Sequence, residues 1–287
     1  MKNPNNPFAN ASTYFINPND ASELGRLLAQ DHSVTNEMGD LFPRSIDTTR
    51  VRSIIDLACG PGGYLLNVAQ TYPQIECIGI DLSEKMISYA QAQIDALHIQ
   101  NVSFQCANIL SPLEFPDTTF DFVNARLVSS FVPVQYWPQL LQEVKRITIP
   151  GGIIRFTEAE WIYTNSRAGE ALADIVIRAH FLSGKSFAPD GKRFGTTLEL
   201  PYLLRDVGLQ NIHRTPFSLD FSSGSMAHEV WYHNLMIAYP LMLPYLLKME
   251  VVTQNDFHQL YEQLSLDMME ETFRGEFFLL SASGMKP

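Results

Sequence analysis

A glycine-rich turn flanked by acidic side chains is the first candidate for chemistry in this sequence. The segment 54–66, IIDLACGPGGYLL, has the pattern of a strand, a tight turn and the start of a helix. Gly60 and Gly62 allow the backbone to bend and a ligand to approach closely, and the first turn of the following helix has free N–H groups. Such a turn binds nucleotides, although a glycine cluster alone also fits an ordinary strand-to-helix turn.

A second acidic residue supports a nucleotide site. Asp81 lies 25 residues after Asp56, at the end of the next predicted strand, where a carboxylate accepts hydrogen bonds from both hydroxyls of a ribose. A dinucleotide-binding turn requires a third small residue, but this chain has Leu65 at that position and Pro61 inside the turn. An NAD(P)-dependent oxidoreductase is therefore the less favoured alternative.

The elements that must position these residues alternate regularly. Apolar runs of strand length occupy residues 52–58, 76–82, 101–107, 120–125 and 152–158. Segments of helical spacing lie between them, at 63–72, 83–97 and 135–148, and Ser83 is a suitable N-cap for the second. Repeated strand, helix and strand predict parallel strands with right-handed crossovers, hence a doubly wound α/β sheet.

Composition and charge exclude several classes of protein. Hydrophobic residues make up 46% and charged residues 18%, a composition that rules out disorder, collagen and coiled coil. The formal charge of −11 repels a phosphate backbone, so we expect no nucleic-acid partner. The cysteines Cys59, Cys77 and Cys106 lie in apolar runs without C-x-x-C spacing. We expect all three to be buried and to bind no metal.

Two segments bear on cellular location. The first dozen residues contain Asn and Pro where a secretory signal needs a continuous apolar stretch, which predicts a cytoplasmic protein. Residues 230–247 have no formal charge and approach the length of about 20 residues that a membrane span requires. His233, Asn234 and two prolines interrupt that stretch, and no strongly basic flank follows. We therefore expect no stable membrane insertion.

Taken together, the motifs resemble those of the class I S-adenosylmethionine-dependent methyltransferases of the small-molecule type. The first motif of that family often reads D-L-G-C-G-P-G, and residues 56–62 read DLACGPG. The resemblance continues in the same order through 78–87, 115–126 and 147–158. It covers roughly residues 50–160 and implies S-adenosyl-L-methionine as cofactor. It also implies a Rossmann-like, seven-stranded sheet whose last strand is antiparallel, with helical cap inserts.

The same resemblance divides the chain into four parts. Residues 1–45 would form an N-terminal arm and helices covering the site, and 46–160 the cofactor-binding α/β core. Residues 161–225 would complete the core and carry a substrate-side insert. Residues 226–287 would form a helical cap and the final strand.

Roles in cofactor binding follow from the matched positions. The resemblance implies that Asp56 and the backbone at Ala58, Gly60 and Gly62 hold the methionine ammonium and surround the sulfonium. Ala58 stands where the family often has its first glycine. Asp81 would bind the ribose.

The adenine and the methionine end have their own implied residues. Leu82 and Met86 would pack against adenine. Asn108 stands where many members have Asp, and its amide oxygen can still accept a hydrogen bond from the adenine amino group. Ile109 would offer a backbone N–H nearby. Three further residues would complete the cofactor site: Asn124, Arg126 and Tyr14.

Some of these roles have structural alternatives. Asn124 and Arg126 would line the methionine end, but an ordinary surface ion pair explains Arg126 equally well. Tyr14 precedes the first predicted helix, within 18–40, and would fold over the site or remain an exposed residue.

Catalytic candidates come from the segments that follow the core. Methyl transfer is an in-line displacement, so the protein mainly positions the nucleophile and excludes water. A base is needed only when the acceptor carries a proton that must leave. His180, one helix after the strand at 152–158, is the favoured base, with a structural histidine as the alternative. Glu158 would steady positive charge developing on an acceptor carbon or simply bond backbone amides.

The inserts are rich in aromatic residues and methionine, which suit a hydrophobic acceptor cavity but also fit a cap core or a dimer contact. We expect a methyltransferase acting on a hydrophobic small molecule, such as a natural-product intermediate, by C- or O-methylation. A cofactor-binding protein of the same fold that catalyses a cyclisation or rearrangement is the alternative. A homo-oligomer is compatible with the aromatic cap.

Overall fold

The computed structural model describes residues 14–17, 20–44 and 46–287. Its centre is one mixed sheet, which has eight strands within these residues, in the order β3-β2-β1-β4-β5-β8-β6, with β7 also pairing with β8. The first five strands in this order pair in parallel. The strand bounds are β1 Ser53–Leu57, β2 Glu76–Asp81, β3 Val102–Cys106, β4 Phe120–Arg126, β5 Thr148–Ala159, β6 Tyr163–Thr164, β7 Gln210–Asp220 and β8 Gly275–Met285. The predicted Rossmann-like α/β fold is confirmed.

The last strand is antiparallel, as expected, but the expected number of strands was too low. β8 pairs antiparallel with β5 along one edge and with β7 along the other. The additional strand is β6, whose two residues pair with Glu276 and Gly275 of β8. A strand of two residues has no alternating pattern, so the sequence does not reveal it.

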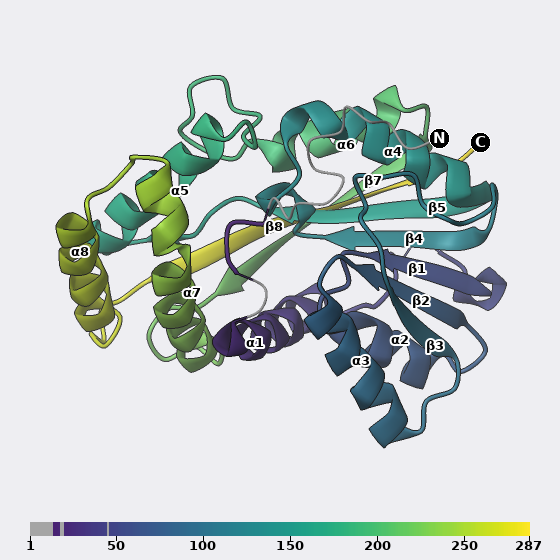
Figure 1. Ribbon diagram of the computed structural model, residues 1–287, viewed down its shortest axis with the longest axis horizontal. Coiled ribbons are helices and arrows are strands. Elements are labelled where there is room, and N and C mark those ends of the chain that lie inside the picture. The colour runs from purple at the N-terminus through teal and green to yellow at the C-terminus, as the bar shows by residue number, and fades with distance from the viewer. Residues whose placement is uncertain (1–13, 18–19, 45) are drawn as a thin grey trace.

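Helices cover both faces of the sheet (Figure 1). α1 Ala21–Met38, α2 Gly63–Thr71 and α3 Glu84–Leu97 lie on one face, and α4 Trp137–Ile147 and α6 Thr196–Asp206 lie on the other. Ser83 caps α3 as predicted, because its hydroxyl accepts a hydrogen bond from the Met86 N–H. Short 3₁₀ turns occupy Thr48–Arg50, Val128–Ser130 and Val134–Tyr136.

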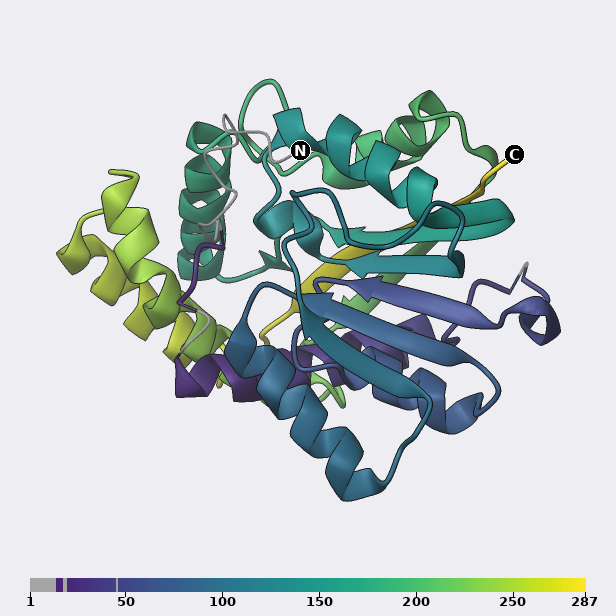
Figure 2. The same ribbon diagram turned by 45° about the vertical axis from the view of Figure 1, so that its right-hand side comes forward.

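A helical cap extends beyond the carboxyl ends of the parallel strands (Figures 1 and 2). It consists of α5 Arg167–Leu182, α7 His228–Lys248 and α8 Gln254–Asp267. α7 packs against α1 and α8, and it buries Trp231, Leu235 and Met242 at helical spacing. Within the part of the chain that is described, no helix combines the length and the apolar character that a membrane span requires.

The apolar core has three parts. Two clusters of buried side chains lie on the two faces of the sheet, and a third joins the cap helices to α1 and to the end of β8. Cys59 and Cys77 are buried in this core, but Cys106 is exposed. The expectation of burial was wrong for Cys106 because β3 is an edge strand of the sheet.

Candidate functional site

A cavity of about 500 Å³ opens at the carboxyl ends of the parallel strands. Its lining comes from the segments that follow β1, β2, β3 and β4, and from α1. This crevice is where ligands bind in doubly wound α/β sheets. The predicted cofactor residues that line it are Tyr14, Asp56, Ala58, Gly60, Asp81, Leu82, Met86, Asn108, Ile109 and Arg126.

The glycine-rich turn is wound by residues in the left-handed region. Ala58, Gly60 and Gly62 have φ values of 53°, 53° and 84°. A Cβ on Gly60 would meet no atom within 4 Å, whereas a Cβ on Gly62 would lie 2.6 Å from Cζ of Phe104. Gly62 therefore lets α2 begin directly against the sheet, and Gly60 leaves the cavity side of the turn open. Gly62 itself does not line the cavity.

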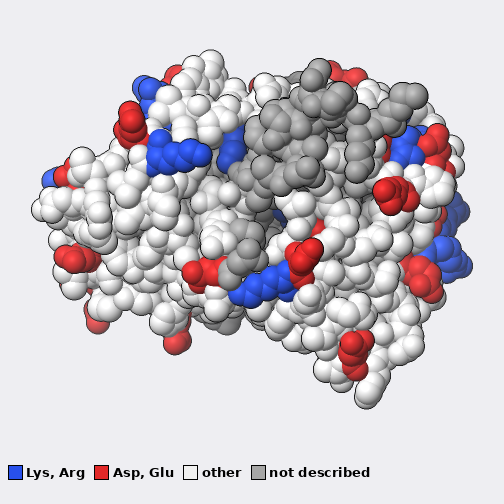
Figure 3. Space-filling view, viewed as in Figure 1, with Lys and Arg blue, Asp and Glu red and all other residues white. Residues whose placement is uncertain are grey.

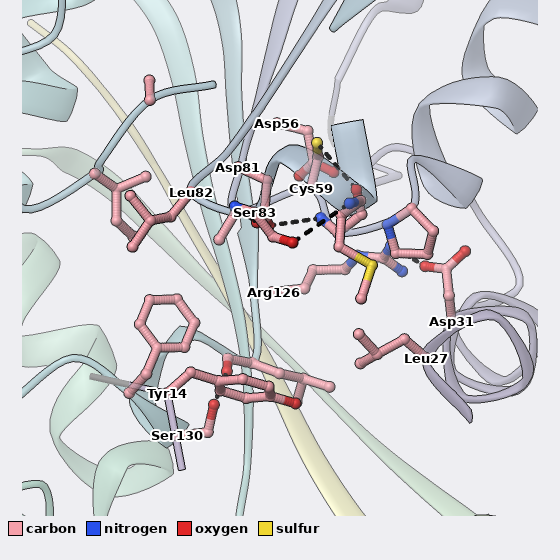
Figure 4. A pocket seen from close by; sticks show the side chains of 18 of the residues that line it. Tyr14, Leu27, Asp31, Asp56, Cys59, Asp81, Leu82, Ser83, Arg126 and Ser130 are labelled. Atoms are coloured by element: carbon pink, nitrogen blue, oxygen red, sulfur yellow. Dashed lines mark hydrogen bonds and ion pairs between the residues drawn. The ribbon is translucent and has the colours of Figure 1, made fainter. Parts of the chain in front are cut away.

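Asp81 connects the turn to the end of β2 (Figure 4). Its two carboxylate oxygens accept hydrogen bonds from the Gly60 N–H at 3.0 Å and the Ser83 N–H at 2.8 Å. Burial raises the pKa of this carboxyl above its ordinary value, and the backbone donors oppose the rise. The carboxylate that sequence spacing assigned to a ribose thus lies beside the glycine turn and on the cavity wall.

Asp56 lines the cavity and is held by a buried chain of hydrogen bonds that extends behind it. Asn124 Nδ2 donates to Asp56 Oδ1 at 2.6 Å, and Arg155 Nε donates to Asn124 Oδ1 at 2.7 Å. Burial raises the pKa of Asp56 to about 6, against the lowering effects of Arg126 and of the Asn124 hydrogen bond. Asn124 is fully buried and supports Asp56 without lining the cavity.

Arg155 is a residue that the sequence reasoning missed. It is 1% exposed, its guanidinium also donates to the Leu41 carbonyl, and it lies over the rings of Tyr64 and Phe122. The available signal was a cation in the middle of the apolar run 152–158. A charge at such a position is buried only when it has partners.

Arg126 is the last residue of β4, and its charge is neutralised by an ion pair. Its guanidinium forms an ion pair with Asp31 and donates to Thr35 Oγ1 at 3.0 Å. Tyr64 packs under it, with the ring centroid 4.7 Å from Cζ. Asp31 also lines the cavity. Sequence reasoning missed it, because no motif marks it and its partner lies 95 residues away.

The residues predicted to contact adenine contribute to the lining of the cavity. Leu82 is exposed at 43%, Met86 is buried, and both line the cavity with Asn108 and Ile109. Asn108 Oδ1 accepts a hydrogen bond from the Leu110 N–H at 2.9 Å. The amide oxygen proposed to meet adenine is therefore already engaged in a local turn.

Tyr14 reaches the cavity from the segment before α1. Its hydroxyl donates to Glu23 Oε1 at 2.6 Å, and Arg26 donates to the same hydroxyl at 3.2 Å. Figure 4 shows Tyr14 and Ser130 across the cavity from Asp81 and Ser83. Tyr14, itself a predicted cofactor residue, thus forms part of the wall opposite Asp81 and Ser83.

The two predicted catalytic residues do not line the cavity. Glu158 accepts hydrogen bonds from the backbone N–H groups of Val128 and Ser129 and from the Ser129 hydroxyl, at 2.9, 3.1 and 2.6 Å. Burial raises its pKa to about 7. The carboxylate therefore holds the 127–131 loop, whose residues form the cavity wall.

His180 is enclosed by aromatic rings. It is 1% exposed and lies between Phe15 and Phe194, with ring centroids 5.2 and 4.7 Å away. Burial, assisted by Lys185, lowers its pKa to about 3, and Nδ1 lies 3.0 Å from the Val176 carbonyl oxygen. The structure does not bring His180 to the cavity surface, and its catalytic role stays a prediction.

Neither positive nor negative side chains predominate on the face shown in Figure 3. Acidic and basic residues are intermingled there around a hollowed surface. The absence of a nucleic-acid partner stays a prediction from net charge.

The fold and the cavity together define a class of protein: an α/β protein of Rossmann type with a nucleotide-cofactor site at its strand ends. A family described as "Methyltransferase domain" matches residues 54–152. These residues contain most of the motifs by which the sequence resembles the class I S-adenosylmethionine-dependent methyltransferases, a family whose cofactor is S-adenosyl-L-methionine. The resemblance seen in the motifs is thus confirmed.

Individual relatives agree with this assignment. A probable methyltransferase, ltbC, of Aspergillus luteorubrus is 33% identical over 145 residues, 48% of this chain and 51% of that protein. A demethylmenaquinone methyltransferase of Bacillus cereus is 27% identical over 187 residues, 61% of this chain and 77% of that protein. The chain spans 40–51% of the length of the curated relatives that match with more than 30% identity.

A solved structure shares the fold. The YcgJ protein of Bacillus subtilis superposes with a TM-score of 0.53 at 16% identity, covering 90% of this chain and 99% of that chain. At this identity the likeness extends to the fold alone.

Proposed function

We propose that the protein transfers the methyl group of S-adenosyl-L-methionine to a hydrophobic small molecule, such as a natural-product intermediate, at carbon or oxygen. The observation that carries the proposal is the position of Asp81, which lies beside the left-handed turn at Gly60 and on the wall of a cavity at the strand ends. The cavity volume of about 500 Å³ is in the range of about 300–1,000 Å³ that small-molecule sites occupy.

The residues present fit this cofactor. Gly60 leaves open space where a side chain would stand, and Asp81 presents an acceptor for ribose hydroxyls. Asp56, supported by Asn124, would hold the methionine ammonium as a carboxylate. Leu82 and Met86 offer the apolar surface on which an adenine would pack.

The cofactor supplies an electrophilic methyl group with a neutral thioether as leaving group. The protein's own residues then have two tasks. α1 and the 127–131 loop enclose the acceptor and exclude water, and Glu158 fixes the backbone of that loop. The names of the relatives, which include a demethylmenaquinone methyltransferase, support an acceptor with a large apolar part.

Binding and product analysis test the proposal. We expect micromolar binding of S-adenosyl-L-methionine by isothermal titration and formation of S-adenosylhomocysteine when an acceptor is supplied. Asp81→Ala removes charge-assisted hydrogen bonds worth about 1.5–3 kcal/mol and should weaken cofactor binding at least tenfold. Asp174→Ala, an exposed change on α5, is the matched control and should leave the affinity unchanged.

Two results would contradict the proposal. Unaltered affinity in Asp81→Ala would show that the cofactor lies elsewhere. Cofactor binding with a transformed substrate but no S-adenosylhomocysteine would favour a cyclisation or rearrangement over methyl transfer.

A further inference from the structure

We propose that the acceptor is an uncharged molecule with an apolar body and an oxygen acceptor, and that the amide of Gln30 binds this oxygen. The inference rests on the proposed function and assigns the acceptor to the α1 side of the same cavity. It names the substrate class and a specificity-determining residue that no sequence motif marks.

The cavity has two chemically different sides. One side follows β1 and β2 and carries the acidic groups of Asp56, Asp81 and Glu84. The other side is formed by α1, by Tyr14 and by the segment after β4, and its side chains are mostly apolar. Its members are Tyr14, Leu27, Gln30, Asp31, Val34, Leu127, Ser130 and Phe131. In Figure 4, Tyr14 and Ser130 lie across the cavity from Asp81, with Arg126 between them.

The charges on the lining disfavour an anionic acceptor. Among the described lining residues Arg126 carries the only Lys or Arg charge, and Asp31, also on the lining, forms an ion pair with it. Three further acidic residues, Asp56, Asp81 and Glu84, share the cavity. A carboxylate or phosphate placed on the apolar side would lose hydration without gaining a free cation.

Gln30 is the polar group that the structure orients on this side. Arg26 Nη1 donates to Gln30 Oε1 at 2.6 Å, and Arg26 is itself held by Glu23 through contacts of 2.7 and 2.8 Å. A guanidinium only donates, so the carbonyl end of the Gln30 amide faces Arg26 and the Nε2 end is left as a donor. No described residue accepts a hydrogen bond from Nε2, and Gln30 lines the cavity.

The neighbouring hydroxyls are engaged within the protein. Ser130 Oγ donates to the Leu127 carbonyl at 2.8 Å, and the Tyr14 hydroxyl donates to Glu23 at 2.6 Å. The two amide hydrogens of Gln30 are therefore the donors that this side offers to a ligand oxygen. Leu27, Val34 and Phe131 supply the surface against which an apolar body would pack.

Three naphthalene probes of similar shape test the inference on the full-length protein saturated with S-adenosylhomocysteine. 2-Acetylnaphthalene carries a neutral oxygen acceptor, 2-naphthoate carries an anion, and 2-ethylnaphthalene carries neither. Equilibrium dialysis or probe fluorescence gives the three dissociation constants. The variants are Gln30→Met, which keeps the side-chain length but removes both donors, and Gln70→Met, an exposed control on α2 outside the cavity.

The expected results are specific. The wild-type protein and Gln70→Met should bind 2-acetylnaphthalene about three- to tenfold tighter than 2-ethylnaphthalene, the range of one net hydrogen bond. Both should bind 2-naphthoate most weakly. Gln30→Met should abolish the preference for the ketone while leaving 2-ethylnaphthalene binding unchanged.

Other results overturn the inference. Binding of 2-naphthoate as tight as that of the ketone, a ketone preference that survives in Gln30→Met, or no binding of any probe would each refute it. Binding of S-adenosylhomocysteine is measured first. A protein that does not bind it refutes the proposed function, whereas one that binds it and gives any of these results refutes only the inference about the acceptor and Gln30.

Discussion

The substitution Gly62→Ala should lower the free energy of unfolding by more than the cost of placing alanine in a left-handed backbone conformation. Gly62 begins α2 with φ 84°, and a Cβ there would lie 2.6 Å from Cζ and 2.8 Å from Cε1 of Phe104. Real Cβ atoms do not approach other atoms this closely, so the ring or the start of the helix must move. Phe104 is buried on β3, which leaves its ring little room.

The magnitude has two parts. The left-handed conformation costs a non-glycine residue about 1–2 kcal/mol, and inserting a methyl group into a packed core costs about 1–3 kcal/mol. Gly224 has the same φ of 84° but no atom within 4 Å of a built Cβ. Gly224→Ala should therefore show the backbone cost alone, and the difference between the two variants should be about 1–3 kcal/mol.

Urea denaturation followed by circular dichroism gives the unfolding free energies of both variants and of Phe104→Leu with and without Gly62→Ala. We expect the double variant to be more stable than the sum of the single effects predicts, because the shorter side chain removes the contact. Equal losses in Gly62→Ala and Gly224→Ala, or strict additivity with Phe104→Leu, would refute the packing argument.

Two further predictions concern pH. Since the pKa of Asp56 is about 6 in the free protein, cofactor affinity should fall as the pH decreases through 6. Asn124→Leu removes a donor to the carboxylate and should move this fall in affinity to higher pH. Titration calorimetry from pH 5 to 8 measures the affinity of both proteins, and an unshifted profile would speak against the Asn124 contact. Burial raises the pKa of Glu158 to about 7 from an ordinary 4.5, so its ionisation opposes folding. The wild-type unfolding free energy should therefore fall relative to that of Glu158→Gln, by up to about 3 kcal/mol, as the pH rises from about 4.5 to 7. Parallel stability curves for the two proteins would contradict the burial of this charge.

Much of the fold was predictable because local patterns are strong here. Buried parallel strands are rich in apolar residues, and 54–57, 76–81 and 120–126 are mostly apolar. Ser83 predicts the start of α3, because an N-cap hydroxyl accepts a hydrogen bond from a backbone N–H within the same segment. Parallel order follows from the alternation itself, since each crossover needs a helix.

The convergence of most of the predicted cofactor residues on one cavity was also predictable from the sequence. In a doubly wound sheet the carboxyl ends of parallel strands meet at one edge, so residues that follow different strands converge. Asp81 and the Gly60 turn do so, with a hydrogen bond of 3.0 Å between them. Their separation in sequence is short enough for a motif to contain both.

The acceptor side depends on contacts between distant segments. Asp31 pairs with Arg126, and Arg26, one helical turn before Gln30, also contacts Asn234. No local pattern relates Asp31 to Arg126 or Arg26 to Asn234. Glu158 lay in a predicted strand end, but only packing showed that its carboxylate binds the backbone at 128–129.

The sequence by itself determined most of the strands and helices, and it predicted which residues gather at the strand ends as candidates for cofactor binding, because hydrophobic periodicity and turn chemistry are local. Only the tertiary structure decided which polar groups face the cavity and which support it from behind. It buried Asn124 and His180, and it brought α1 over the strand ends. Those outcomes depend on how α1 and α7 pack on each other and on the sheet, and the free energy of that packing is shared among many weak contacts that no short motif records.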